Sequence, residues 1–359
     1  MELNSYMEHG IKSISSTVSA FYLNNLKGIK FISGFVPSLA RASRLRKESE
    51  KNGLHIPPFL IASISSKCNL HCIGCYARAD GMCTEGGRND EMTAEEWKKI
   101  FTEADEIGVS FILLAGGEPL IRKDVINTAA EFKHIAFPVF TNGTLIDDEY
   151  IEFFDKNRNM IPVISMEGDS AQTDIRRGEG VAESIAKTMA ELKKRGILFA
   201  VSVTVTSENL CNAVTEEYLN ELREKGCGVV FYVEYVPAEK GTERLVLSHK
   251  DTEWLNNETQ RLKKIKKDMT ILCFPGDEEY MEGCLAAGRG FFHIAPDGSA
   301  EPCPFSPFSV HNMKSCSIKE VLESRFFSNV RDISRNEKVH NGGCTLFNHE
   351  NEVRKSIEN

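Results

Sequence analysis

The sequence predicts an α/β fold in which six strand–helix units form an incomplete barrel. From residue 57 onward, short apolar runs rich in β-branched residues alternate with stretches whose apolar residues have helical spacing. This alternation favours a parallel sheet covered by helices, as an open sheet or a barrel. Six units rather than eight indicate a partial (β/α)6 barrel of the TIM type. After residue 270 the pattern stops, and cysteine, glycine and proline become frequent.

The individual elements follow in order. Residues 59–65 are apolar and rich in β-branched side chains, which predicts the first strand. Thr93 with Glu96 forms a capping box, and a helix is expected to follow. The same criteria predict strands at 110–114, 138–140, 162–166, 199–205 and 229–236, and helices at 124–133, 147–157, 182–195 and 216–225.

Three segments flank this predicted barrel of residues 57–249. Residues 1–56 are predicted to form a helical arm, because their apolar runs are too short to span a bilayer and end in a basic cluster. The arm could pack on the barrel or a partner, or lie on a membrane surface as an amphipathic helix. Residues 250–270 are expected to form a charged connecting helix. Residues 271–359 have little apolar sequence, which predicts a separate small domain organised by a metal centre.

Composition narrows the class of function. The 359 residues are 41% hydrophobic and 26% charged, with a net charge of -9, as in an ordinary soluble protein. No global positive field is present to attract nucleic acid. The odd count of 11 cysteines in a long chain with no signal peptide at its start points to metal binding in a reducing cytoplasm.

One cysteine group follows directly on the first strand. Cys68, Cys72 and Cys75 lie in one loop at the carboxyl end of that strand, where barrel active sites are built. Three thiolates on a [4Fe–4S] cluster leave one of its four irons open. A zinc site is the simpler alternative, but CxxC zinc sites come in pairs with tetrahedral ligand sets. The spacing therefore favours an iron–sulfur cluster with an open coordination position.

This loop resembles that of the radical SAM superfamily, whose spacing Cys68-x3-Cys72-x2-Cys75 reproduces. Gly116-Gly117-Glu118-Pro119 matches the superfamily's GGEP motif, which holds the methionine amino group of S-adenosylmethionine (SAM). The resemblance implies that SAM chelates the open iron and is cleaved reductively to a 5′-deoxyadenosyl radical, which abstracts hydrogen from a substrate. It also implies a reductase, ferredoxin or flavodoxin as electron donor.

Further SAM contacts are implied more loosely. The candidates are Thr141 and Asn142 after the third strand, Ser165 with Glu167 after the fourth as ribose contacts, Thr204 and Thr206 after the fifth, and Arg176 and Arg177 for the methionine carboxylate. Each arginine could equally form a surface ion pair. The superfamily usually has an aromatic residue before the third cysteine, but this chain has Gly74. Tyr76 is the candidate to replace that adenine contact.

The C-terminal cysteines resemble the SPASM domain, which holds auxiliary clusters. Cys284 and Cys303 have its opening spacing, and a Pro-Asp-Gly turn predicts the hairpin between them. The dense cysteine run that completes the domain is absent, so the tail resembles the shortened version called twitch, with one auxiliary [4Fe–4S] cluster. Cys344 is the expected third ligand, Cys273 the fourth and Cys316 the reserve, and whether three or four cysteines bind stays open. The remaining cysteines, 83, 211 and 227, are expected to be buried thiols.

The sequence leaves the substrate open. The tail favours a peptide, a protein or a cofactor precursor, although the residues before the barrel look helical rather than like the winged-helix leader-binding domain that many peptide maturases carry. A small-molecule dehydrogenase acting on an alcohol or sugar and a lipid-modifying enzyme are alternatives, the latter because of the basic, partly apolar N-terminus. A non-enzymatic iron–sulfur electron carrier or sensor is the alternative from another class. Glu234 and Tyr235 are positional candidates for the substrate pocket.

Overall fold

The computed structural model describes residues 3–23, 25–275, 283–336 and 344–357. Its described strands form a ten-stranded sheet in the order β10-β9-β8-β1-β2-β3-β4-β5-β6-β7. Neighbours from β8 through β7 run parallel, and only β8–β9 and β9–β10 are antiparallel. The strands are β1 (Phe59–Ser65), β2 (Phe111–Gly116), β3 (Phe137–Thr141), β4 (Met160–Met166), β5 (Phe199–Val205), β6 (Cys227–Glu234), β7 (Thr270–Phe274), β8 (His293–Ile294), β9 (Ser299–Glu301) and β10 (His311–Asn312).

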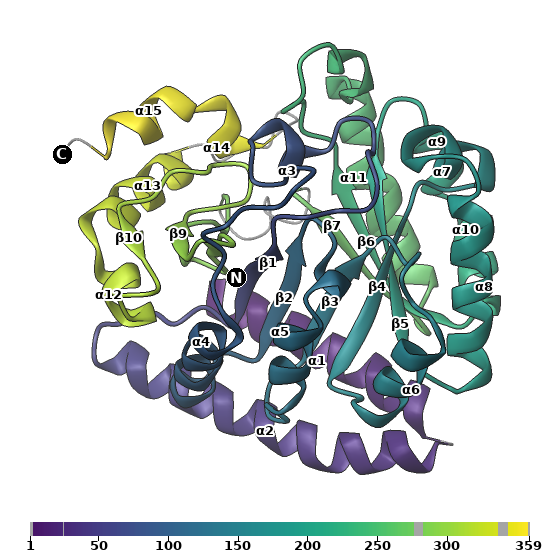
Figure 1. Cartoon of the computed structure of the whole chain (residues 1–359), viewed down its shortest axis with the longest axis horizontal. Coiled ribbons are helices and arrows are strands. Elements are labelled where there is room, and N and C mark those ends of the chain that lie inside the picture. The colour runs from purple at the N-terminus through teal and green to yellow at the C-terminus, as the bar shows by residue number, and fades with distance from the viewer. Residues whose placement is uncertain (1–2, 24, 276–282, 337–343, 358–359) are drawn as a thin grey trace.

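Helices cover the outer face of the parallel sheet, so the predicted partial barrel is confirmed (Figure 1). Their buried faces follow helical spacing; in α4 they include Trp97, Ile100 and Phe101. The helices between β1 and β7 are α3 (Tyr76–Ala79), α4 (Ala94–Ile107), α5 (Lys123–Ala130), α6 (Asp148–Lys156), α7 (Ser170–Arg177), α8 (Val181–Lys194), α9 (Leu210–Ala213), α10 (Glu216–Glu224) and α11 (His249–Ile265).

A seventh parallel strand was not predicted. Strand β7 pairs with β6 along its whole length, from Val229 opposite Thr270 to Val233 opposite Phe274. The sequence analysis extended the connecting helix to residue 270, whereas α11 ends at Ile265. The short strand lies between a lysine-rich turn and the cysteine-rich tail. Its apolar residues therefore looked like the start of the tail and not like a further barrel strand.

The C-terminal region continues the same sheet rather than standing apart from it. Strand β8 pairs with β1, and β9 and β10 extend the edge. The helix Arg325–Asn336 was also not predicted; it buries Phe326, Phe327 and Val330. Apolar burial therefore contributes to the stability of this region, in addition to any bound metal. Its helices are α12 (Ile318–Glu323), α13 (Arg325–Asn336), α14 (Thr345–Asn348) and α15 (Glu350–Lys355).

The N-terminal arm consists of α1 (Leu3–Tyr22) and α2 (Leu26–Lys51), which cross the amino end of the barrel strands (Figure 1). Buried residues of both helices pack on the first residues of strands, such as Phe111. The arm thus packs on the barrel, which was one of the two alternatives. Its outward side exposes Leu23, Leu26, Ile29 and Val36. Among the described helices, none is both long enough and apolar enough to span a membrane.

Candidate functional site

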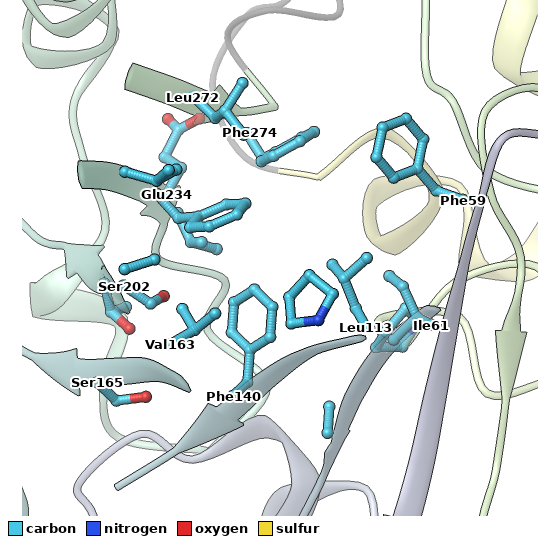
Figure 2. Close-up of a pocket in the computed structure, with 18 of the residues that line it drawn as sticks. Phe59, Ile61, Leu113, Phe140, Val163, Ser165, Ser202, Glu234, Leu272 and Phe274 are labelled. Carbon is cyan, nitrogen blue, oxygen red and sulfur yellow. The ribbon is translucent and has the colours of Figure 1, made fainter. Parts of the chain in front are cut away.

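A cavity of about 880 Å³ runs through the barrel, from helix α1 at the amino end of the strands to the cysteine loop at their carboxyl ends. Figure 2 shows Leu113, Phe140 and Val163 directed into it, with Ser165 and Ser202 further along. Parallel strands present alternate side chains to the interior, so each strand contributes a row of lining residues. The six cysteines Cys68, Cys72, Cys75, Cys284, Cys303 and Cys344 all line this cavity.

The backbone after β2 holds the start of the cysteine loop. The amide of Gly117 donates to the carbonyl of Ser65 at 2.7 Å, and the amide of Glu118 donates to that of Lys67 at 2.8 Å. A Cβ atom on Gly117 would lie 2.3 Å from the Lys67 carbonyl oxygen, and one on Gly116 would lie 2.3 Å from that of Ser65. Any side chain here would push the two segments apart. The two glycines therefore let β2 approach the cysteine loop.

Two further loops hold the middle of the cysteine loop. Ile73 and Arg176 are joined twice: the Ile73 amide donates to the Arg176 carbonyl at 2.9 Å, and the Arg176 Nε donates to the Ile73 carbonyl at 3.1 Å. The amide of Gly74 donates to the Glu239 carboxylate at 2.5 Å. Glu239 was not predicted to contact the cysteine loop, because no local pattern connects it to a loop 165 residues earlier.

Gly74 is explained by Tyr235. Gly74 has a φ of +70°, and a Cβ atom there would lie 2.4 Å from the Tyr235 hydroxyl. Tyr235 lines the cavity and donates to Thr242 Oγ1 at 2.6 Å, which fixes its ring. Tyr76 lines the cavity as well, but its ring packs on Phe305 with centroids 5.0 Å apart. The space next to the third cysteine is therefore taken by Tyr235.

The three thiols of the cysteine loop are half-buried, and Cys72 lies beside positive charge. Burial raises the pKa of the Cys68 thiol to about 11. Burial also raises the pKa of the Cys72 thiol, although the charges of Arg177 and Arg176 oppose that effect. Arg177 Nη1 lies 3.9 Å from Cys72 Sγ. Because thiolates and not thiols bind iron, an incoming metal must displace these protons, and the arginines favour the thiolate form.

Glu118 of the GGEP motif is a buried structural anchor. Its carboxylate accepts hydrogen bonds from the Leu120 amide at 3.1 Å, the Thr141 hydroxyl at 2.8 Å and the Asn142 amide at 2.8 Å. Burial raises the pKa of this carboxyl to about 7, although these hydrogen bonds oppose the shift. Gly116, Gly117 and Asn142 line the cavity, whereas Glu118, Pro119 and Thr141 stand behind that wall. A methionine amino group would thus meet mainly backbone here.

Arg176 and Arg177 share one carboxylate, that of Glu167. Arg176 Nη1 and Arg177 Nη2 each lie 2.5 Å from Glu167 Oε1, and the arginine side chains are only 14% and 9% exposed. Both arginines therefore form the ion pair that was the alternative to a SAM contact, but this pair lines the cavity and is largely shielded from solvent. The other oxygen, Glu167 Oε2, is buried with no hydrogen-bond partner among the described residues. Ser165 and Thr204 line the cavity beside this group, whereas Thr206 is not among the lining residues.

A second group of thiols lies in the same cavity. Cys303 and Cys344 hydrogen-bond to each other, and Cys284 lies close enough for its charge to affect Cys303. The Cys344 thiol, together with burial, raises the pKa of the Cys303 thiol well above its usual range. Burial first of all, and then the charges of Cys75 and Cys303, raise the pKa of Tyr76. Tyr76 is thus near a thiol of each group.

The other cysteines lie outside this cavity wall. Cys273 sits between Leu272 and Phe274 of β7, which both line the cavity, while its own side chain belongs to the main core. Cys316 does not line the cavity either. Cys83 and Cys227 are buried as expected, but Cys211 is exposed, so that expectation was wrong. The structure assembles three of the four cysteines predicted for the tail.

The residues fit the groups that the sequence implies. Three thiols beside two arginines suit an anionic iron–sulfur cluster, and the buried unpartnered oxygen of Glu167 suits a hydroxyl donor such as a ribose. Among the described residues, no three Cys, His, Asp or Glu side chains converge closely enough for a single metal ion. A four-iron cluster takes each thiolate on a different iron, so its ligands need not meet at one point.

Comparison with known proteins agrees with this geometry. Residues 62–214 match the model of the radical SAM superfamily. The AdoMet-dependent heme synthase of Methanosarcina barkeri is 28% identical over 77% of this chain and 85% of its own length. The mycofactocin maturase MftC of Mycolicibacterium smegmatis is 26% identical over 75% of this chain and 69% of its own. Both alignments extend beyond the matched domain.

Solved structures share the fold. Streptococcus suis SuiB bound to S-adenosylmethionine superposes with a TM-score of 0.67 at 19% identity, covering 85% of this chain and 77% of SuiB. At this identity the likeness supports the arrangement of elements and nothing finer. The match over residues 62–214, together with the cysteine loop, identifies this part of the chain as a radical SAM domain, and SuiB shares the arrangement of elements beyond it.

Proposed function

We propose that Cys68, Cys72 and Cys75 hold a [4Fe–4S] cluster on which SAM is cleaved, and that hydrogen is then abstracted from a substrate bound in the barrel cavity. The observation that carries the proposal is the convergence of these thiols, the GGEP backbone and a buried arginine pair on one cavity wall. When bound, the cluster would pass one electron to SAM, and breakage of the S–C5′ bond would then give methionine and the 5′-deoxyadenosyl radical. The residues of the chain itself bind and orient SAM and exclude water.

The arginine pair provides the charge that SAM needs. Arg176 and Arg177 carry two positive charges against the single negative charge of Glu167. One positive charge is therefore left to attract a carboxylate such as that of methionine. The hydrogen bonds between Arg176 and Ile73 tie this charge to the cysteine loop. Binding of the carboxylate is thus coupled to the position of the thiols.

The remaining contacts orient the nucleoside and exclude water. Ser165 and Thr204 present hydroxyls next to Glu167, whose buried Oε2 lacks a described partner. A ribose hydroxyl can donate to that oxygen. Tyr235 offers an aromatic face beside Gly74, where adenine is expected. The apolar walls beyond keep water away from a radical, which would otherwise take part in side reactions.

The second group of thiols supports an auxiliary [4Fe–4S] cluster on Cys284, Cys303 and Cys344. Their contacts favour three cysteine ligands, with an open iron, over a set completed by Cys273. For Cys273 to be the fourth ligand, its side chain would have to leave the core and turn into the cavity. Tyr76, which lies near a thiol of each group, packs on Phe305.

The substrate class follows from the relatives. SuiB has been solved with its precursor peptide SuiA, MftC is a maturase, and the Methanosarcina barkeri relative is a heme synthase. A peptide or a cofactor precursor is accordingly the substrate class that the likenesses support, with a reductase, ferredoxin or flavodoxin as electron donor. An electron carrier or sensor has no need of the arginine pair or the GGEP backbone.

The test is formation of 5′-deoxyadenosine by the full chain, reconstituted with iron and sulfide under anaerobic conditions and supplied with SAM and dithionite. Wild type is expected to release 5′-deoxyadenosine, and Cys72→Ala is expected to release none above background. Cys211→Ala is the matched control because this cysteine is exposed and lies outside the cavity lining. No product from wild type with an intact cluster, or equal product from Cys72→Ala, would overturn the proposal.

A further inference from the structure

Helix α2 of the N-terminal arm leaves one face uncovered. Its buried residues, among them Phe35 and Leu39, pack against the barrel. The residues of the opposite face lie three, four or seven positions apart and are exposed, and they include Leu26, Ile29, Val36, Ala40, Arg44 and Lys47. Figure 1 shows α2 along the lower edge of the molecule, with this face directed away from the sheet. We call this surface the outer face of α2.

The outer face is apolar over its first half. Leu26 is 86% exposed, and Leu23, in the turn before α2, is 68% exposed. Ile29 and Val36 follow on the outer face and are exposed as well. Single exposed apolar residues are common on protein surfaces, whereas four within the fourteen residues 23–36 form a patch typical of an interaction surface.

The basic residues of the arm divide into two sets. One set is paired with acidic residues, namely Lys27 with Asp155, Arg41 with Asp105 and Arg46 with Glu8. The other set lies on the outer face and consists of Lys30, Arg44, Lys47 and Lys51, none of which forms an ion pair with a described residue. Glu48 offsets one of these four charges. The outer face therefore keeps a net positive charge after all its described pairs are counted.

The arm and the rest of the chain carry opposite charges. Residues 3–51 contain eight lysines and arginines and three acidic residues, which gives them a net charge of +5. The whole chain has a net charge of -9, so the residues outside the arm together carry -14. An anionic surface therefore attracts the arm and repels the remainder of the molecule, which fixes the orientation in which the two can meet.

From these observations we propose that the outer face of α2 binds the surface of a membrane that contains anionic lipids. The side chains of Lys30, Arg44 and Lys47 lie at the level of the lipid phosphates. Leu26 and Ile29 enter the boundary between the headgroups and the acyl chains. The 26 residues of α2 extend over about 39 Å, so the helix lies along the membrane surface. The cysteine loop, at the carboxyl ends of the strands, then faces away from the membrane.

Other occupants fit the outer face less well. A nucleic acid matches its cations, but the phosphate backbone offers no apolar surface on which to bury Leu23 and Leu26. A second copy of the chain, related by two-fold symmetry, would bring two positively charged faces together. A membrane surface presents anionic phosphates and apolar depth side by side, as the outer face requires.

The test is flotation of the anaerobically reconstituted full chain with phosphatidylcholine vesicles that either contain or lack phosphatidylglycerol. Wild type is expected to float only with the anionic vesicles, and to be released when salt rises from about 0.1 M to about 1 M. Lys30→Glu combined with Lys47→Glu is expected to weaken binding at least about tenfold. Lys240→Glu combined with Lys250→Glu is the matched control, because these exposed lysines follow β6 at the opposite end of the barrel and the net charge changes equally.

A second variant tests the apolar part of the face. Leu26→Gln combined with Ile29→Gln keeps every charge and is expected to weaken binding at least about threefold. Circular dichroism checks the fold of each variant, and the glutamine variant serves alone if the glutamate variant does not fold.

Four results would overturn the proposal: no flotation of wild type, equal flotation with both kinds of vesicle, undiminished binding by either folded arm variant, or an equal loss in the control. A dimer that the glutamine variant converts to a monomer, measured by light scattering, would overturn it as well, because a second copy would then cover the face. Flotation needs no SAM, so its result and that of the 5′-deoxyadenosine assay are independent.

Discussion

Gly74, Gly116 and Gly117 lack side chains because another segment of the chain occupies the space that a Cβ atom needs. Around the cysteine loop, the occupying groups are backbone carbonyls at two positions and the Tyr235 ring at the third. The motif glycines could be recognised in the sequence, but their physical partner could not. Tyr235 follows Gly74 by more than 150 residues in the sequence, and only the fold brings the two together.

Replacement of Gly74 tests this crowding. Gly74→Ala is expected to reduce the free energy of unfolding by about 1–2 kcal/mol for the positive φ and by about 1–3 kcal/mol more for displacing Tyr235. Gly81→Ala is the control, since Gly81 has nearly the same φ, +71°, and nothing within 4 Å of its Cβ position. Urea denaturation measures the free energy of unfolding of both variants. Equal losses of this free energy in the two variants would show that Tyr235 does not fill the space.

Glu118 makes stability depend on pH. Its carboxyl has a pKa raised to about 7 from 4.5, above all by burial. As pH rises, the unfolded chain loses this proton at a lower pH than the folded chain does. The stability that protonated Glu118 adds to the folded chain is therefore complete below pH 4.5 and is lost as pH rises to 7. The loss is on the order of 3 kcal/mol.

Glu118→Gln is expected to remove that dependence. The variant should also be less stable at pH 5 by about 1–3 kcal/mol, because an amide NH2 would face the Asn142 amide donor. Urea denaturation of the metal-free protein at pH 5 and pH 8 measures both effects. The same pH dependence in the variant as in wild type would assign it to other groups.

At the scale of elements, the strands β1 to β6 were predictable because each is a β-branched apolar run followed by an amphipathic helix. Strand β7 has the same character, but no helical pattern follows it in the sequence, so periodicity gave no reason to separate it from the tail. Helix α13 was not predicted for another reason. Phe326, Phe327 and Val330 have helical spacing, but the surrounding cysteine-rich composition predicted a metal-organised region instead.

The N-terminal arm is an integral part of the barrel's amino end. Phe35 is 2% exposed and packs against Phe111, whereas its neighbour Val36 is 41% exposed. Phe35→Ala is expected to cost about 3–5 kcal/mol of unfolding free energy. Val36→Ala is expected to cost under about 0.5 kcal/mol. Thermal and urea denaturation compare them, and a similar small loss for both would mean that the arm is not stably docked.

At the scale of the whole molecule, the fold brings two groups of thiols from opposite ends of the chain into one cavity. The sequence identified both groups by their spacing. It could not decide which tail cysteines meet, because that depends on how β7, β8 and α14 are placed around the barrel opening. Cys344 contacts Cys303 in the cavity, whereas Cys273 belongs to the core, and our proposal of Cys344 as the third ligand rests on that difference.

The proposed function requires this one cavity to hold two separate four-iron clusters, the reactive one on Cys68, Cys72 and Cys75. Iron analysis of the anaerobically reconstituted chain tests it most directly. Wild type is expected to hold about eight irons per chain. A variant with Cys68, Cys72 and Cys75 changed to alanine and a variant with Cys284, Cys303 and Cys344 changed to alanine are each expected to keep about four. Retention of all the iron by either variant, or its complete loss from either, would contradict the claim.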